Sequence, residues 1–254
     1  MKKEPRKLHT PSFGRGLRAL SLLSVVLLIG AFSMVFFYAP NDADQGFIQK
    51  IFYVHVPVAI VALLGFIAGG IYGALYLWRG RRADDLRSYV AIHQAVILGV
   101  AALVTGSIWA RASWGHWWVW DEPTLVSFLV VFLLFACYWP LRFSLEDPER
   151  QARFAAVFAV IAGAFVPINF MAVRLAQSYA PHPKVFMATG GGMPTSMFVT
   201  FLLCLLAVAV LAVTLWKYEL TSKHATMRVR QLKRRLSADS SGTTVGRSAA
   251  PQQI

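Results

Sequence analysis

The chain has 254 residues, of which 57% are hydrophobic and only 15% are charged, and its mean hydropathy is +0.54. Soluble domains carry about 25% charged residues, so the composition excludes an ordinary soluble protein and indicates an integral membrane protein. The formal net charge is +13. No basic face is interleaved with exposed aromatics and no nucleic-acid motif is present, so we do not expect nucleic acid as a partner.

Six apolar stretches are long enough to cross a bilayer, which takes about 20 residues as a helix. They cover residues 17–38, 51–78, 89–109, 124–142, 154–173 and 194–216. The first stretch ends at Tyr38-Ala39-Pro40 without a small-residue cleavage site, so we expect a retained helix rather than a signal peptide. The expected fold class is therefore an all-α integral membrane protein, a bundle of six transmembrane helices.

Composition divides the chain into three parts. Residues 1–16 form a short N-terminal segment, residues 17–216 form the six-helix domain, and residues 217–254 form a tail. From Lys217 to Leu236 the tail is basic and lies next to the membrane, which favours contact with anionic lipid head groups. From Ser237 onward it is poor in apolar residues, and we expect disorder there.

Basic residues are divided unequally between the two sets of connecting segments. All but four of the 25 Lys and Arg residues lie in the N-terminal segment and the first turn of the stretch that follows it, in the 79–88 and 142–153 loops, and in the tail. The exceptions are Lys50, Arg111, Arg174 and Lys184. Cytoplasmic loops carry the excess of Lys and Arg, so we expect both termini in the cytoplasm. The 39–50 and 174–193 loops, and the segment between the third and fourth helices, then face outward.

That outer segment is unusually rich in tryptophan. Four of the eight tryptophans lie within Trp114-Gly115-His116-Trp117-Trp118-Val119-Trp120-Asp121, which we call the Trp segment. Trp is enriched at membrane interfaces without any ligand, so a dense aromatic belt is one interpretation. Flat indoles beside an imidazole and a carboxylate also suit a platform for a large planar ligand. Both interpretations stay open on composition alone.

Three of the six histidines, His55, His116 and His182, fall on the outer side. Two imidazoles from separate segments can ligate a haem iron from opposite faces. The four outer basic residues can pair with haem propionates. The alternative for each outer histidine is a solvated loop residue. His93 lies within the third helix without a second histidine at its depth, so a hydrogen-bonded packing role is the simpler interpretation.

Other chemistries lack their motifs. We find no phosphate-binding loop, nucleophile elbow or His-Glu-x-x-His site, and no enzymatic reaction is expected. Cys137 and Cys204 are not in the spacing of a thiol redox motif or of covalent haem attachment. Asp121 and Glu122 are adjacent and do not suit an acid/base pair. We expect Asp121 instead to accept hydrogen bonds from backbone N–H groups at the start of the fourth helix.

Two stretches of the sequence carry a family resemblance. Gly106-Ser107-Ile108-Trp109-Ala110-Arg111, followed by the Trp segment, resembles the signature of the haem-handling protein family of bacterial cytochrome c maturation, which has a Trp-rich (WWD) motif. The stretch from Gln45 to Pro57 resembles the start of the second helix in that family. The resemblance covers roughly residues 16–217.

The resemblance implies a multi-pass protein of the bacterial inner membrane with its haem site on the outer face. Haem b would be bound transiently, with His55 and His182 as axial ligands. The covering loop would comprise Trp114, Trp117, Trp118, Trp120 and Asp121, and the propionate partners would be Arg111 and Arg174. Haem would pass to a haem chaperone, with ABC transporter subunits of the same system as further partners.

The sequence departs from the family pattern at three places. The family usually has a Trp pair before its second histidine, where this chain has Arg174-Leu175-Ala176-Gln177-Ser178-Tyr179. A basic residue usually follows the Asp, where this chain has Glu122-Pro123-Thr124. His116 stands where the family usually has a small or polar residue, so a role as an extra or alternative ligand stays open.

Three rival interpretations remain. A membrane b-type cytochrome would place paired histidines in facing helices nearer the bilayer interior. A non-haem transporter or complex subunit would carry intramembrane charges along a substrate path, and these helices have almost none. A haem–apocytochrome ligase belongs to the same superfamily. The short chain and the His55-Val56-Pro57 context favour instead a protein that delivers haem to the chaperone.

Overall fold

The computed structural model describes residues 15–176 and 193–247, and within them the chain is helical. The elements are α1 (Arg15–Phe37), the 3-10 helix η1 (Phe47–Ile51), α2 (Phe52–Arg79), α3 (Arg82–Trp114), α4 (Pro123–Ala136), α5 (Tyr138–Phe143), α6 (Pro148–Ala176) and α7 (Thr195–Arg247). No β-strand occurs in these two ranges. The predicted all-α class is confirmed.

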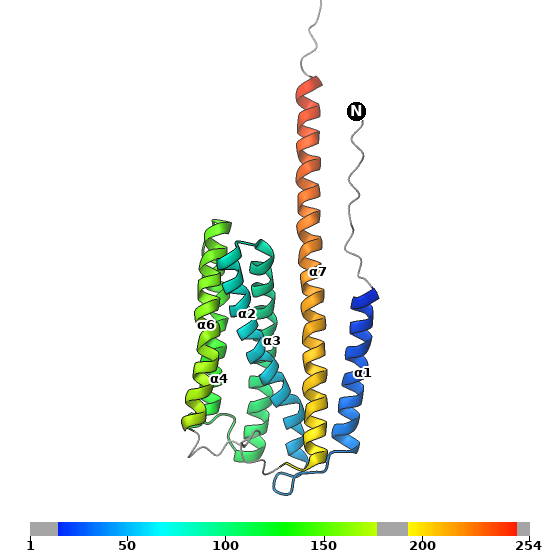
Figure 1. Cartoon of the computed structure of the whole chain (residues 1–254), viewed down its shortest axis with the longest axis vertical. Helices are drawn as coiled ribbons and strands as arrows, with labels where there is room; N and C mark the ends of the chain where they lie inside the picture. Colours follow the sequence, from blue (N-terminus) through cyan, green and yellow to red (C-terminus); the bar gives the residue numbers. More distant parts are fainter. Residues whose placement is uncertain (1–14, 177–192, 248–254) are drawn as a thin grey trace, which may run out of the picture.

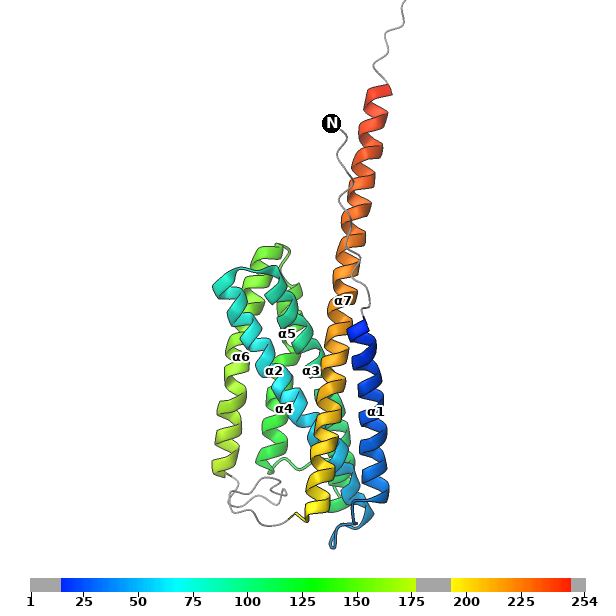
Figure 2. The ribbon, with the colours of Figure 1, turned by 45° about the vertical axis from the view of Figure 1, so that its right-hand side comes forward.

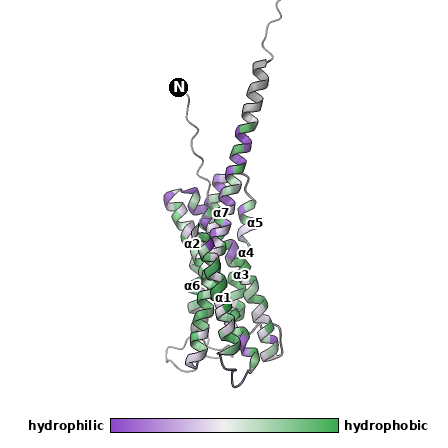
Figure 3. Ribbon diagram, turned by 90° about the vertical axis from the view of Figure 1, so that its right-hand side faces the viewer, coloured by the Kyte–Doolittle hydropathy of each residue, from purple (hydrophilic) through white to green (hydrophobic). Residues whose placement is uncertain are grey.

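Six segments are long and apolar enough to cross a membrane, which confirms the six predicted spans. They run alternately up and down, so that α1 begins and α7 leaves the bundle at the same end (Figure 1). We call this the tail end, and the opposite end, where α3 finishes at Trp114, the Trp end. Apolar residues cover the middle of the bundle, and hydrophilic residues gather towards its two ends and on the projecting part of α7 (Figure 3).

Several helix boundaries differ from those expected. The third helix continues past residue 109 to Trp114, so the first tryptophan of the Trp segment is helical. The fourth span breaks at Cys137 into α4 and α5. Pro140 explains this break, because it has no N–H to donate to the Ala136 carbonyl and its ring crowds that carbonyl.

The last helix also differs from its prediction. α7 continues through the tail to Arg247, over a stretch where we expected disorder from Ser237 onward. Extending an existing helix avoids the cost of nucleating one, so the membrane-spanning part of α7 favours helix in the polar residues that follow it.

The helices pack around two separate cores. The larger core is formed by the five helices from α2 through α6. In it Phe66 of α2 stacks on Phe135 of α4, with 4.1 Å between ring centroids. The smaller core joins α1 and α7 to the first turns of α2, around Tyr53 and Phe201. α1 and α7 therefore form a pair that stands beside the α2–α6 group (Figure 2).

Small residues allow the helices of the larger core to approach closely. A Cβ on Gly69 of α2 would lie 2.5 Å from Ile92 Cγ1 of α3. A Cβ on Gly70 would lie 2.9 Å from the Ala159 carbonyl of α6. Gly69 and Gly70 thus serve the packing role that small residues have between membrane helices.

Candidate functional site

The Trp end gathers the turn after α1, the end of α3 and the start of α4. Trp109 of α3 is buried, and its indole Nε1 donates to Gln45 Oε1 of the 38–46 turn at 3.1 Å. Trp114 packs edge-on against Trp109, with 4.8 Å between ring centroids and 73° between planes. Trp109 therefore holds both the 38–46 turn and Trp114, the first residue of the Trp segment.

Gly115 ends α3 and redirects the chain. Its φ of 79° lies in the left-handed region, which glycine adopts without steric cost, and its N–H donates to the Arg111 carbonyl at 3.1 Å. The Arg111 guanidinium in turn donates to the Gly115 carbonyl. Arg111, an expected propionate partner, thus also stabilises the C-terminus of α3, where a positive charge is favourable.

Of the three indoles beyond Gly115, those of Trp117 and Trp120 are exposed and that of Trp118 is half-buried. Trp118 and Trp120 meet edge to face at 5.9 Å and 65°. The exposed fractions of Trp117 and Trp120 are 61% and 71%, and His116 and Asp121 are also exposed. Indole faces accessible in this way can stack on a flat apolar ligand.

The structure corrects the expectation for Asp121. The N-cap of α4 is Glu122, whose Oε1 accepts from the Thr124 N–H at 3.3 Å. Glu122 is fully buried, whereas Asp121 is exposed. Pro123 supplies the reason, because proline is favoured at the first position of a helix and so makes the residue before it the cap.

Lys50 is also placed differently from the expectation that it could pair with a propionate. Its side chain is buried, with an exposed fraction of 8%, and its Nζ donates to the carbonyls of Val35 at 2.6 Å and Ala39 at 3.0 Å. Val35 lies in the last turn of α1, and Ala39 follows the end of that helix at Phe37. Lys50 therefore caps a helix C-terminus, a role that the excess of negative partial charge there favours.

His55 lies in the first turn of α2 and faces α3. Its Nδ1 is 3.1 Å from the Ala102 carbonyl and 3.1 Å from Thr105 Oγ1. The Thr105 hydroxyl lies 2.7 Å from the Ala101 carbonyl, to which it donates its proton. Both groups beside Nδ1 therefore accept, so Nδ1 carries the ring proton and the lone pair of the neutral imidazole is on Nε2. This is the tautomer that ligates a metal through Nε2 with a hydrogen bond orienting the ring.

The backbone of Gly106 forms the floor under the His55 ring. A Cβ at Gly106 would lie 2.8 Å from His55 Cε1, closer than side chains tolerate. His55 contacts α3 at Thr105, which precedes Trp114 on the same helix. At a rise of about 1.5 Å per residue, Thr105 and Trp114 are about 14 Å apart along the helix axis. His55 is thus deeper in the bundle than the Trp segment, rather than level with it at the surface.

Two expected site residues cannot be placed. His182 lies outside the described residues. The backbone of Arg174 belongs to α6, but its side chain also lies outside the described part. Among the described residues no three His, Cys, Asp or Glu side chains gather as a metal-binding cluster. The second axial ligand therefore stays a prediction.

Sequence reasoning gave no role to Trp109, Thr105 or Gly106, which the structure places around the site. The sequence carried one signal for them. Gly106 and Trp109 are one helical turn apart, and a glycine in an apolar helix marks a close approach by a neighbour. Which neighbour approaches, here the His55 ring, depends on the pairing of α2 with α3.

A family model described as Heme exporter protein C matches residues 4–235, nearly the whole chain. The chain belongs to the Heme exporter protein C family. Among proteins of that name, the one from Bradyrhizobium diazoefficiens is 32% identical over 220 residues, which is 84% of this chain and 80% of the relative. The Escherichia coli K12 protein is 33% identical over 162 residues, 61% of this chain and 63% of the relative.

A third Heme exporter protein C, from Rhodobacter capsulatus, is 30% identical over 156 residues, or 61% of this chain and 64% of the relative. The chain thus matches less than two thirds of the length of the Rhodobacter capsulatus and Escherichia coli proteins. Family membership agrees with the resemblance seen in the Gly106–Arg111 stretch and the Trp segment.

Proposed function

We propose that this protein binds haem as cargo at the Trp end and hands it on for cytochrome c maturation. The observation that carries the proposal is the His55 ring, which two acceptors on α3 hold in the tautomer suited to iron ligation through Nε2. Membership of the Heme exporter protein C family supports haem as the cargo.

The proposed ligand set follows from the site and the family resemblance. His55 and His182 serve as axial ligands of haem b, which is bound transiently and without covalent attachment. Trp114, Trp117, Trp118, Trp120 and Asp121 form the cover over the porphyrin, and the exposed indoles of Trp117 and Trp120 suit this role. Arg111 and Arg174 pair with the propionates. Transfer is an exchange of ligands, so the protein needs no enzymatic reaction to perform it.

The proposed setting is the bacterial inner membrane, with both termini in the cytoplasm and the Trp end facing outward. The distribution of Lys and Arg between the two ends supports this orientation. The proposed partners are a haem chaperone, which receives the haem, ABC transporter subunits of the same system, and membrane lipid. Ala43→Cys, in the turn after α1, should make the protein react with an impermeant thiol reagent from outside, and Glu146→Cys should not.

Absorption spectra of the detergent-purified protein, oxidised and reduced, test the proposed cargo and ligands. The native protein should show a Soret band and low-spin α and β bands. His55→Ala and His182→Ala should each weaken them, while His224→Ala, in the tail, should leave them unchanged. A native protein that takes up no haem even with added haemin would overturn the proposal. Full haem occupancy in His55→Ala would overturn the ligand assignment.

A further inference from the structure

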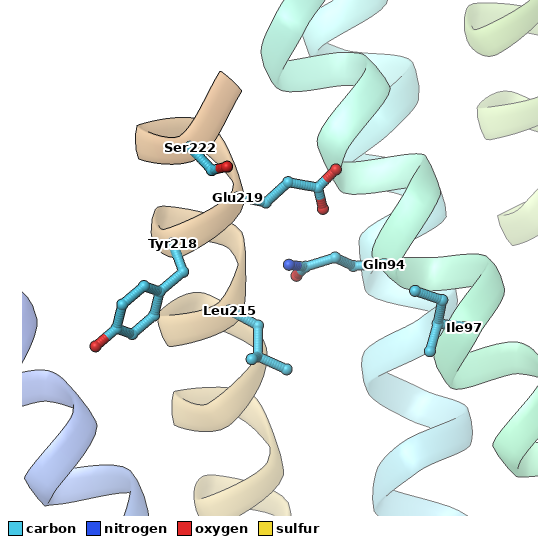
Figure 4. Close-up of a pocket in the computed structure, with 6 residues that line it drawn as sticks. All are labelled: Gln94, Ile97, Leu215, Tyr218, Glu219 and Ser222. Atoms are coloured by element: carbon cyan, nitrogen blue, oxygen red, sulfur yellow. The ribbon is translucent and has the colours of Figure 1, made fainter. Parts of the chain in front are cut away.

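The last part of α7 leaves the bundle at the tail end and continues in the direction of the spans (Figure 1). Where it leaves, Tyr218 points towards α1 and Glu219 towards α3 (Figure 4). The Tyr218 hydroxyl lies 3.0 Å from Ser21 Oγ, and the Glu219 carboxylate accepts from His93 Nδ1 at 2.9 Å. Further along α7 every residue from His224 to Ser237 is exposed, and we call this stretch the projecting segment.

The projecting segment has one apolar side. It is formed by four residues at intervals of four, three and four, which we call the apolar stripe: Ala225, Val229, Leu232 and Leu236. At about 100° per residue they fall within an arc of about 60°, which is the spacing by which helices pair in a coiled coil. The exposed fractions of Val229, Leu232 and Leu236 are 51%, 42% and 69%. Exposed apolar residues that are ordered in this way, rather than scattered, are typical of an interaction site.

The apolar stripe prolongs the side of α7 that packs inside the bundle. Cys204, Tyr218 and Leu232 are separated by multiples of seven residues and so lie along one side of the helix. Cys204 is buried in the core that α7 shares with α1. α1 begins at Arg15, so it covers α7 for only about 9 Å beyond the contact of Tyr218 with Ser21. The side of α7 that α1 covers in the bundle is therefore exposed in the projecting segment.

The apolar stripe lies beyond the reach of lipid. Trp216 and Tyr218 stand at the end of the apolar part of α7, where aromatic residues mark the membrane interface. Leu232 follows Tyr218 by 14 residues, which is about 21 Å along the helix axis. The head-group layer is only about 5–7 Å deep, and the potential of anionic lipid falls off within about 8 Å. A protein partner therefore suits the stripe better than a lipid surface does.

Basic residues border the apolar stripe on both sides. Arg228 and Arg235 lie along one edge, and Lys233 lies along the other. In a pair of coiled helices such edge positions face the partner and decide which partner is accepted. A second copy of this chain in parallel would bring Arg228 against Lys233, and like charges repel. Residues 1–14, with four basic residues and one acidic residue, are unsuited for the same reason.

We propose that the apolar stripe docks an acidic amphipathic helix of a partner protein. The partner helix packs its own apolar residues against Val229, Leu232 and Leu236, and it presents Asp or Glu to the basic residues along both edges. Complementary charge at the edges selects this partner, and apolar contact along the stripe holds it.

The docking site lies at the opposite end of the protein from the Trp segment, so this inference does not depend on the proposed haem function. It also differs from contact between the basic tail and anionic lipid. Such contact needs positive charge alone, whereas the docking site needs an apolar stripe on one side of the helix and the charges that border it.

Peptide binding to the full-length protein in nanodiscs of a choline phospholipid tests the proposal. The probe is a fluorescent helical peptide of about three heptads with Leu at the seam positions and Glu at the edges. Fluorescence anisotropy at physiological salt should show binding. A scrambled peptide of the same composition should bind about tenfold or more weakly, because its apolar residues do not form one side of a helix.

Substitutions on the two sides of the projecting segment separate the stripe from the tail as a whole. Leu232→Ala should weaken binding of the ordered peptide about tenfold, since an apolar contact is lost. The matched control is Met227→Ala, which should leave the affinity unchanged. Met227 lies on the opposite side of the same helix, and its exposed fraction of 44% is close to the 42% of Leu232.

Charge reversals make the same comparison at constant net charge. Lys233→Glu/Arg235→Glu, at the edges of the stripe, should abolish binding of the ordered peptide. Arg230→Glu/Arg234→Glu, on the opposite side, changes the net charge equally and should weaken binding about threefold at most, because the intervening charges are screened. All of these residues are exposed, so each variant should keep the six-span fold.

Equal affinity for the ordered and scrambled peptides, or equal loss of affinity in the two charge-reversal variants, would overturn the proposal in favour of unspecific attraction. Self-association of the protein that Leu232→Ala abolishes would instead assign the stripe to a second copy. In nanodiscs that contain phosphatidylglycerol the ordered peptide should still bind. Loss of binding there would show that the tail lies on anionic lipid, and it would also overturn the proposal.

Discussion

The imidazole of His55 rests on the backbone of Gly106, with only 2.8 Å between His55 Cε1 and the position that a Cβ on Gly106 would occupy. Gly106→Ala should therefore displace the ring from its acceptors on α3 and lower haem occupancy, measured as Soret absorbance per protein. Helix propensity alone favours Ala over Gly by about 1 kcal/mol, so a general weakening of α3 is not the expected cause.

Gly30→Ala is the matched control for this change, because nothing lies within 4 Å of the Cβ position at Gly30 of α1. It should leave the spectrum unchanged. A Gly106→Ala protein with native haem occupancy and an unaltered spectrum would show that the His55–Gly106 contact does not position an iron ligand.

The hydroxyl of Thr105 accepts from His55 Nδ1 and should tune the iron as well as orient the ring. Hydrogen bonding at Nδ1 increases the basicity of a ligating imidazole, which favours the ferric state. Thr105→Val should thus raise the reduction potential of the bound haem, measured by redox titration, while Thr105→Ser should restore the native value. Identical potentials in Val and Ser variants would assign Thr105 a packing role only.

The exposed indole of Trp120 should matter for haem and little for folding. With an exposed fraction of 71%, its replacement by Ala should change the free energy of unfolding by no more than about 0.5 kcal/mol. Loss of its stacking should weaken haem affinity about tenfold in a haemin titration. Trp78→Ala, which removes an exposed tryptophan at the tail end, is the control and should not alter affinity.

The buried pair of Asp85 and Arg142 should govern stability at the tail end. Arg142 contacts both carboxylate oxygens of Asp85, at 2.7 Å and 2.8 Å. Arg142→Leu leaves a buried carboxylate without its partner and should cost about 3–5 kcal/mol of unfolding free energy in detergent. Arg82→Leu, which breaks an exposed pair with Glu149, should cost less than about 1 kcal/mol.

The double variant Asp85→Leu/Arg142→Leu separates the pair from the volume it fills. It should be more stable than Arg142→Leu alone, because no unpaired charge is left buried. If both variants were equally destabilised, packing rather than charge pairing would account for the loss.

Hydropathy was sufficient to place the six spans, because each needs a long apolar run that little else in a sequence produces. It could not locate the ends of the helices. α3 continues to Trp114 because Gly115 is the first residue to leave helical geometry, and hydropathy does not report that. Pro140 and Pro123, however, were visible signals for the break at Cys137 and for Glu122 as the cap of α4.

The candidate site was predictable by residue type but not by geometry. The sequence singled out His55 and the Trp segment, yet the acceptors at Ala102 and Thr105 become neighbours of His55 only through the register of α2 against α3. Lys50 shows the same limit, since its role as a cap for α1 depends on how the 38–46 turn folds back.

Imidazole rescue of a His55→Gly protein tests the central claim, ligation of haem by His55, most directly. The variant should lose the low-spin spectrum, and added imidazole should restore it by occupying the space that the side chain leaves beside Thr105. The same concentration should have little effect on a Trp120→Ala protein, whose axial ligands are intact. A His55→Gly protein that keeps the native low-spin spectrum without imidazole would contradict the account.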